Sequence, residues 1–272
     1  AVTIDVNCSI DASGRGYTSS RGPGAGKDWF YASGGAYGGR GGRSSNRVVG
    51  GEPYGSIIAP SDLGSGGGRD DDSNGSGGTG GGLIHLEAGG ILTINGAIRA
   101  NGNNGSSNES GGGAGGGIWI VAGLITGNGV ISTNGGNASN TSVAGGGGGG
   151  RIALYYNSAA NYTYVGTLTA FGGTGYYSGG SGTIFRKPAD ATYGNLLLAS
   201  NTSAAREPVV LDGNTPVCNL KASAKARVEV KAPLSLAGLE LADKETVLFP
   251  PVGQSLVINV LADVTIRTDS VI

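Results

Sequence analysis

Short segments in which apolar and polar residues alternate recur along the whole chain. Leu92/Ile94 and Ile152/Leu154 are clear examples. A period of two places successive side chains on opposite faces, so each strand would bury one face and expose the other. No stretch has a convincing helical period. The pattern therefore predicts an all-β protein with almost no helix.

Four of the predicted strands follow directly on a run of glycines. The last glycine of each run is Gly82, Gly117, Gly150 or Gly182, at spacings of 35, 33 and 32 residues. Each unit then continues with a strand, a short break and, in the first three, a second strand. A period of about 20–50 residues is typical of stacked repeats. We therefore predict a parallel β-solenoid, or β-helix.

The glycine runs themselves need an explanation, because residues 145–150 are six consecutive glycines. An ordered glycine costs about 0.5–1 kcal/mol relative to alanine. The runs are either flexible linkers or extended, polyglycine II-like segments that stack and satisfy one another's N–H and C=O groups. Because each run has the same position in its repeat, we favour stacking.

The composition changes sharply near residue 190. Residues 64–150 contain 32 glycines, whereas residues 191–272 contain four. We therefore divide the chain into glycine-rich solenoid repeats at 1–190 and a glycine-poor β region at 191–272. The second region either continues the solenoid or forms a small β domain. Its apolar pairs are expected to face inward: Val228/Val230, Leu234/Leu236, Leu239/Leu241 and Ile258/Val260.

The two ends of the sequence resemble each other. Residues 2–10 read VTIDVNCSI and residues 264–272 read VTIRTDSVI. If the match is more than chance, the chain ends on the type of coil with which it begins, and copies stack head to tail through open solenoid ends. The candidate interface residues are Val2, Ile4, Ile10, Val264, Ile266 and Ile272.

Charge and cysteine content exclude several classes of partner. The formal net charge is −1, which gives no expectation of binding to nucleic acid. No apolar stretch reaches 18 residues, so no membrane insertion is expected. Cys8 and Cys218 either form one bridge or are two small buried residues. We favour the second, because stacked coils would separate them beyond disulfide reach.

The sequence contains no convincing catalytic or metal-binding motif. His85, the single histidine, lies between Ile84 and Leu86 and is expected on the exposed face of a strand. The acidic run at 70–72 matches no calcium-binding spacing, so we expect a solvated loop. GPGAGK at 22–27 lacks the first glycine and the Ser/Thr of a phosphate loop. We predict no enzyme activity, no cofactor and no metal site.

The sequence has eight N-x-S/T sequons, where its composition predicts about three. They reflect either N-linked glycosylation or the crowding of Asn, Ser and Gly in loops. The glycosylation candidates are Asn74, Asn104, Asn108, Asn137, Asn140, Asn161 and Asn201, and an eighth sequon starts at Asn7.

Residues 2–186 resemble the glycine-rich β-helical repeat regions of large secreted or surface proteins of microbes. The resemblance rests on IDASGRGY, YGGRGG, LGSGGG, GGGAGGGIWI and GGGGGGRIALYY. It implies an extracellular or cell-surface location and a structural or adhesive role. We therefore expect an extracellular structural protein that forms a head-to-tail homopolymeric fibre.

Two alternatives stay open at this point. One is a carbohydrate-binding adhesin or phage-type receptor-binding module, in which aromatic residues of 29–37, Tyr155/Tyr156 and Tyr176/Tyr177 stack on sugars. The other is a polysaccharide-active enzyme.

Overall fold

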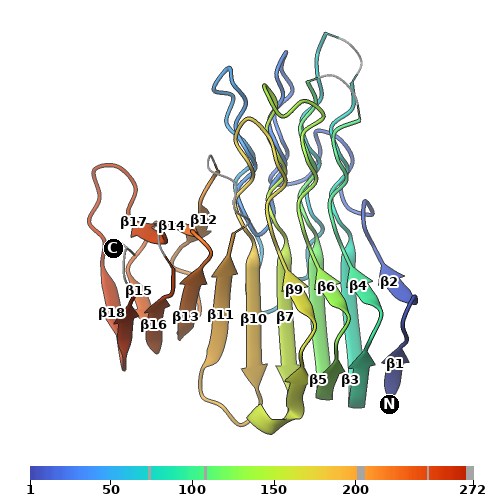
Figure 1. Ribbon diagram of the computed structural model, residues 1–272. Helices are drawn as coiled ribbons and strands as arrows, with labels where there is room; N and C mark the ends of the chain where they lie inside the picture. Colours follow the sequence, from blue (N-terminus) through green and yellow to red (C-terminus); the bar gives the residue numbers. More distant parts are fainter. Residues whose placement is uncertain (73–74, 107–108, 201–205, 244, 268–272) are drawn as a thin grey trace.

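The structure is a computed structural model that describes residues 1–72, 75–106, 109–200, 206–243 and 245–267. Its regular structure is almost entirely β-strand (Figure 1). In the described residues the exception is one short 3₁₀ helix, η1 (Ala159–Asn161). No helix of the described part is long and apolar enough to cross a membrane. The expectation of an all-β chain is confirmed.

One sheet of ten strands runs through the described part of the molecule, in the order β1-β3-β5-β7-β10-β11-β13-β16-β19 with β8 paired to β5. All of its pairs are parallel except β10 with β11. Its strands are β1 (Val2–Ile4), β3 (Leu83–Ile94), β5 (Gly117–Gly127), β7 (Arg151–Tyr156), β8 (Tyr162–Tyr164), β10 (Thr183–Pro188), β11 (Gly194–Ala199), β13 (Cys218–Ser223), β16 (Gly238–Leu241) and β19 (Val264–Ile266).

Three smaller parallel sheets accompany this main sheet, and each successive stretch of chain adds a strand to them. The first contains β2 (Ser9–Asp11), β4 (Ala97–Arg99), β6 (Val130–Ser132) and β9 (Thr167–Thr169). The second contains β12 (Val209–Leu211), β14 (Arg227–Val230) and β17 (Val247–Phe249), and the third contains β15 (Leu234–Leu236) and β18 (Ile258–Val260). Among the described strands the sheets are open, with an unpaired edge at each end.

The chain reverses its direction between β10 and β11, close to the expected boundary at residue 190. Because this pair is antiparallel, β11, β13, β16 and β19 run opposite to β3, β5, β7 and β10. Ile184 faces Leu197 and belongs to the first apolar core, whereas Phe185 faces Leu196 and belongs to the second. Neighbouring residues of a strand point to opposite faces. The two cores therefore lie on opposite faces of the main sheet, which a purely parallel stack would not give.

The expected inward pairs can be compared with these cores. Ile152/Leu154, Val228/Val230, Leu234/Leu236 and Leu239/Leu241 are buried, as the alternation predicted. Ile258 and Val260 pack against the second core but stay partly exposed, because they belong to the last rung of their sheet.

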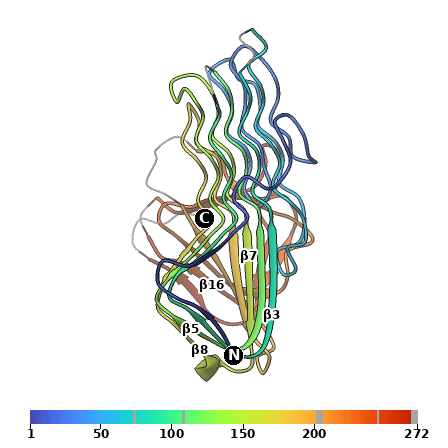
Figure 2. The ribbon, with the colours of Figure 1, turned by 90° about the vertical axis from the view of Figure 1, so that its right-hand side faces the viewer.

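The glycine runs extend from the strands as an ordered bundle (Figure 2). Successive N–H groups of the run 111–117 donate to three neighbouring segments in rotation: residues 111 and 114 to 65–68, residues 112 and 115 to 145–148, and residues 113 and 116 to 100–103. The run 145–150 repeats the pattern toward 32–35, 177–180 and 133–136. A repeat of three residues is that of a polyproline II-type helix. The alternative of flexible linkers is thereby wrong for these runs.

Glycine is required in these runs by lack of space. A Cβ added at Gly112 would lie 2.0 Å from the carbonyl oxygen of Gly136, and one at Gly147 would lie 2.0 Å from that of Gly113. Positive φ angles occur at other glycines, such as Gly127. The backbones therefore approach more closely than any side chain allows, and this close approach permits the dense hydrogen bonding.

Ion pairs join the glycine bundle to the glycine-poor region. The Arg43 guanidinium donates to both carboxylate oxygens of Glu207, at 2.6 and 3.2 Å, and the Glu207 side chain is 3 % exposed. Arg40 contacts Glu52 and Glu229 at 2.9 and 3.0 Å. These contacts fix the bundle against β14 and the segment before β12.

Candidate functional site

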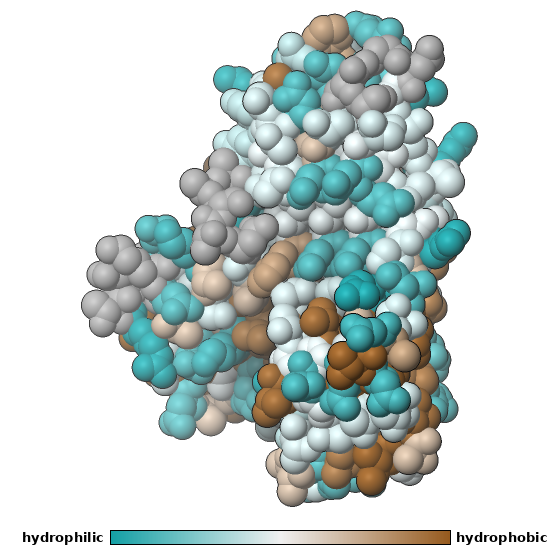
Figure 3. Space-filling view, turned by 45° about the vertical axis from the view of Figure 1, so that its right-hand side comes forward, coloured by the Kyte–Doolittle hydropathy of each residue, from teal (hydrophilic) through white to brown (hydrophobic). Residues whose placement is uncertain are grey.

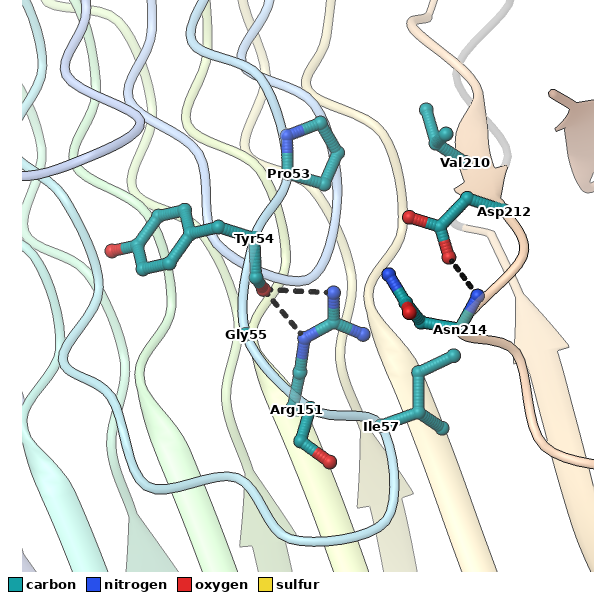
Figure 4. Close-up of a pocket in the computed structure, with 9 residues that line it drawn as sticks. Pro53, Tyr54, Gly55, Ile57, Arg151, Val210, Asp212 and Asn214 are labelled. Carbon is teal, nitrogen blue, oxygen red and sulfur yellow. Dashed lines mark hydrogen bonds between the residues drawn. The ribbon is translucent and has the colours of Figure 1, made fainter.

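A pocket of about 430 Å³ lies where the loop at 53–57 meets β7 and the turn after β12 (Figure 4). Its lining combines one cationic side chain, one carboxylate and one amide with apolar groups. The residues are Pro53, Tyr54, Gly55, Ser56, Ile57, Arg151, Val210, Asp212 and Asn214. Its volume falls within the range of about 300–1,000 Å³ that is usual for small-ligand sites.

Arg151 supplies the cation of this pocket. It is the first residue after the six glycines, and it points away from the core that receives Ile152. Its Nε and Nη2 donate to the Tyr54 carbonyl at 3.1 and 2.9 Å, and its Nη1 donates to Thr183 Oγ1 at 3.2 Å. The side chain lies over the Tyr37 ring, 5.5 Å from the centroid. Neutral groups therefore hold the guanidinium in place.

The charge of Arg151 lacks a direct counter-ion within the described part of the chain. The residue is 4 % exposed, and no carboxylate described here lies within 4.0 Å of its nitrogens. Burial lowers the pKa of the Arg151 guanidinium, and Tyr37, Asp212 and Asp62 oppose that shift. An arginine stays protonated in proteins. The wall of the pocket therefore carries a desolvated positive charge.

The opposite wall is polar and more exposed. Asp212 and Asn214 lie in the turn after β12, where the Asn214 N–H donates to Asp212 Oδ1 at 2.9 Å. Figure 4 shows the Arg151 guanidinium pointing into the space between the loop and this turn. The pocket can thus offer N–H donors on one side and carboxylate and amide groups on the other.

The predicted interface residues lie at the two ends of the main sheet. Val2 and Ile4 belong to β1 at one edge, and Val264 and Ile266 to β19 at the other. Ile4 is only 6 % exposed because it packs into the first core. The half-buried Ile10 lies in β2, and Ile272 is outside the described residues.

The C-terminal edge exposes an apolar hollow of about 470 Å³, lined by Leu239, Pro250, Leu256, Ile258, Val260 and Val264. Val264 and Ile266 continue the inward rows of Leu239 and Leu241 in β16. They are 51 % and 47 % exposed, whereas the two leucines are 4 % and 0 % exposed. Within the described residues, the second core is therefore uncovered at this edge.

The glycosylation candidates that the structure describes lie in or beside loops. Asn104 and Asn137 are exposed, and their Oδ1 atoms accept the backbone N–H groups of Asn137 and Thr174 at 2.8 and 2.9 Å. Asn140 and Asn161 are partly buried, and Asn7 is exposed in the turn after β1. Asn74, Asn108 and Asn201 lie outside the described residues. Stacked asparagines thus also link successive repeats.

The structure does not bring the proposed sugar-stacking aromatics together. Tyr155 donates to the Ile58 carbonyl at 2.6 Å, and Tyr156 is buried in the first core. Tyr176 and Tyr177 follow a different glycine run, and Arg43 lies over the Tyr177 ring. Trp29, in another loop, is 55 % exposed.

The other candidate residues from the sequence are His85 and the acidic run at 70–72. His85 is exposed as expected, and it stacks on Trp119 with ring centroids 4.3 Å apart. Asp70 is 2 % exposed and accepts the Asp72 N–H, which corrects the expectation of a wholly solvated acidic loop. The described residues contain no group of three or more metal-ligating side chains.

Both cysteines are free, so the described chain has no Cys8–Cys218 bridge, as predicted. Cys218 is buried in the second core, where burial raises the pKa of its thiol to about 11. Cys8 is exposed in the turn before β2, because that turn lies outside both cores. The expectation that both cysteines are buried is therefore wrong for Cys8.

No protein-family model matches the chain, and it matches neither a curated protein nor a solved structure. The pocket around Arg151 was missed in the sequence. Its one local signal was an arginine at the point where the glycine run ends and the strand begins. The rest of its lining comes from residues 53–57 and 210–214, which lie between 59 and 98 residues away from Arg151 in the sequence.

Proposed function

We propose that the chain is a β-solenoid building block of an extracellular structural fibre in which copies assemble head to tail. The proposal depends on the exposed apolar rung of β19, where Val264 and Ile266 extend a core that nothing described covers. β19 pairs with β16 alone among the described strands. A strand edge with free N–H and C=O groups is a template for another strand, and natural proteins normally protect it.

A second copy is the occupant that fits this edge. At the opposite edge, Val2 and Ile4 extend the inward row of Leu92 and Ile94, while Thr3 faces solvent. Figure 1 places the two edges at opposite ends of the stack. Figure 3, in which the N-terminal side is turned forward, shows apolar patches below the pale glycine bundle. Val6, in the turn that follows β1, is 66 % exposed. A contact between unlike edges leaves one edge free on each copy, and therefore continues as a filament.

The reversal at β10–β11 determines how successive copies meet. β19 runs opposite to β3, and their cores lie on opposite faces of the main sheet. A copy that is merely translated would place its apolar rung on the wrong face. A half-turn about the stacking axis reverses both the strand direction and the face. Each subunit of the fibre is therefore rotated by about half a turn relative to the one before.

The extracellular location is part of the same proposal. It is supported by the eight sequons and by the similarity of residues 2–186 to surface-protein repeats. Exposed Asn104 and Asn137 beside the glycine bundle leave room for N-linked glycans.

Sedimentation velocity over a range of concentrations tests the assembly. The wild type should form species much larger than 26.7 kDa, and Ile266→Glu should remain monomeric because it places a charge on the apolar rung. Val165→Glu is the matched control, since Val165 is 81 % exposed in the turn between β8 and β9. A wild type that is monomeric at every concentration would contradict the proposal, as would assembly of Ile266→Glu equal to that of the control.

A further inference from the structure

We propose that the pocket between Arg151 and the turn at 212–214 binds the carboxylate of a sugar acid, such as a uronate residue. The pocket lies over β7, in the middle of the main sheet and away from both edges. The inference is therefore independent of assembly. It begins with the guanidinium, which the fold holds at the pocket wall without a carboxylate partner among the described residues.

The guanidinium has N–H groups to spare. An arginine carries five N–H donors, and the Tyr54 carbonyl and the Thr183 hydroxyl use three of them. Nη1 and Nη2 each retain one N–H. A pair of N–H groups at the end of a guanidinium fits the two oxygens of a carboxylate, and charge-assisted bonds of this kind are about twice as strong as neutral ones. A buried cation also favours an anion, because water screens it poorly.

The wall formed by Asp212 and Asn214 determines which chemical groups the rest of the ligand must carry. Asp212 accepts the Asn214 N–H through Oδ1, and its remaining acceptor sites can take ligand hydroxyl groups. The Asn214 amide supplies both a donor and acceptors. A ligand that has a carboxylate on one side and several hydroxyls on the other satisfies both walls. Ile57, Pro53 and Val210 provide apolar surface for the C–H groups of a ring.

Isothermal titration with galacturonate, galactose and the methyl ester of galacturonate tests the assignment on the wild-type protein. We expect saturable binding of galacturonate that is at least 10-fold tighter than that of galactose or the ester. Both controls lack the carboxylate charge, and hydrogen bonds to a charged group contribute more than hydrogen bonds between neutral groups. Absence of saturable galacturonate binding, or equal binding of the ester, would overturn the proposal.

Variants of the turn place the ligand within the pocket. Asp212→Ala and Asn214→Ala should each weaken galacturonate binding at least fivefold. Gly213→Ala is the matched control, because the added Cβ would have its nearest neighbour at 3.9 Å. Binding that is unchanged in both turn variants, or that becomes tighter in Asp212→Ala, would show that hydroxyl groups do not meet this wall. Tighter binding of glycine than of galacturonate would replace the sugar acid by a zwitterion and refute the assignment.

Discussion

Replacing Gly147 by alanine tests whether the close packing of the glycine runs stabilises the fold. The added Cβ would lie 2.0 Å from the Gly113 carbonyl oxygen, and ordinary contact begins at 3.4 Å. The runs would have to separate by about 1.4 Å. Overpacking of this kind costs about 1–3 kcal/mol.

The same separation would weaken two hydrogen bonds that join these two runs. The Gly112 N–H donates to the Gly145 carbonyl at 3.1 Å, and the Gly115 N–H donates to the Gly148 carbonyl at 2.9 Å. Each bond contributes about 1 kcal/mol net. Together with the overpacking, we expect Gly147→Ala to lower the free energy of unfolding by about 3–5 kcal/mol. That is a large part of the 5–15 kcal/mol that is typical of a domain.

Urea denaturation followed by circular dichroism measures this loss, with Gly89→Ala as the matched control. An added Cβ at Gly89 meets nothing within 4 Å, so the free energy of unfolding should stay unchanged or rise by up to about 1 kcal/mol. If Gly147→Ala lowers the free energy of unfolding by less than about 1 kcal/mol, the runs are not held together by close backbone contact.

Three further predictions concern single groups. Arg43→Ala leaves the Glu207 carboxylate buried without its partner, so it should lower the free energy of unfolding, measured by thermal unfolding, by about 3 kcal/mol. Arg69→Ala should lower it by less than about 0.5 kcal/mol, because the Arg69 side chain is 55 % exposed. At pH 8, a thiol-alkylating reagent should modify Cys8 and spare Cys218 until the protein is denatured, because burial raises the pKa of the Cys218 thiol to about 11; equal labelling of both in the folded protein would contradict its burial. Protein secreted by a eukaryotic host should exceed the polypeptide mass of 26.7 kDa and lose the excess on enzymatic deglycosylation, and a bare mass would exclude sugar on Asn104, Asn137 and Asn140.

Local patterns in the sequence were enough to predict the strands, and also to predict that the glycine runs are ordered segments and not flexible linkers. Alternation at Ile152/Leu154 reports burial directly, because the strand period is two. The 32–35-residue spacing predicts parallel pairing of successive repeats, and β5, β7 and β10 pair in that way. Both signals depend on residues that are close in the sequence or on one repeated spacing.

The reversal at β10–β11 and the Arg151 pocket could not be predicted in the same way. The reversal depends on the short turn at 189–193, and alternation alone does not say on which side of a shared sheet a core lies. The pocket needs Arg151, Tyr54 and Asp212 in one place, and these belong to three segments that meet only after the sheet has formed. No spacing along the sequence indicates that these three segments come together.

Electron microscopy of the purified wild-type protein at high concentration would show head-to-tail assembly directly. We expect unbranched filaments, with the glycine bundles of successive subunits pointing to opposite sides because each subunit is rotated by about half a turn. Filaments in which all the bundles project to the same side would contradict the half-turn. A field of single particles of monomer size would contradict head-to-tail assembly itself.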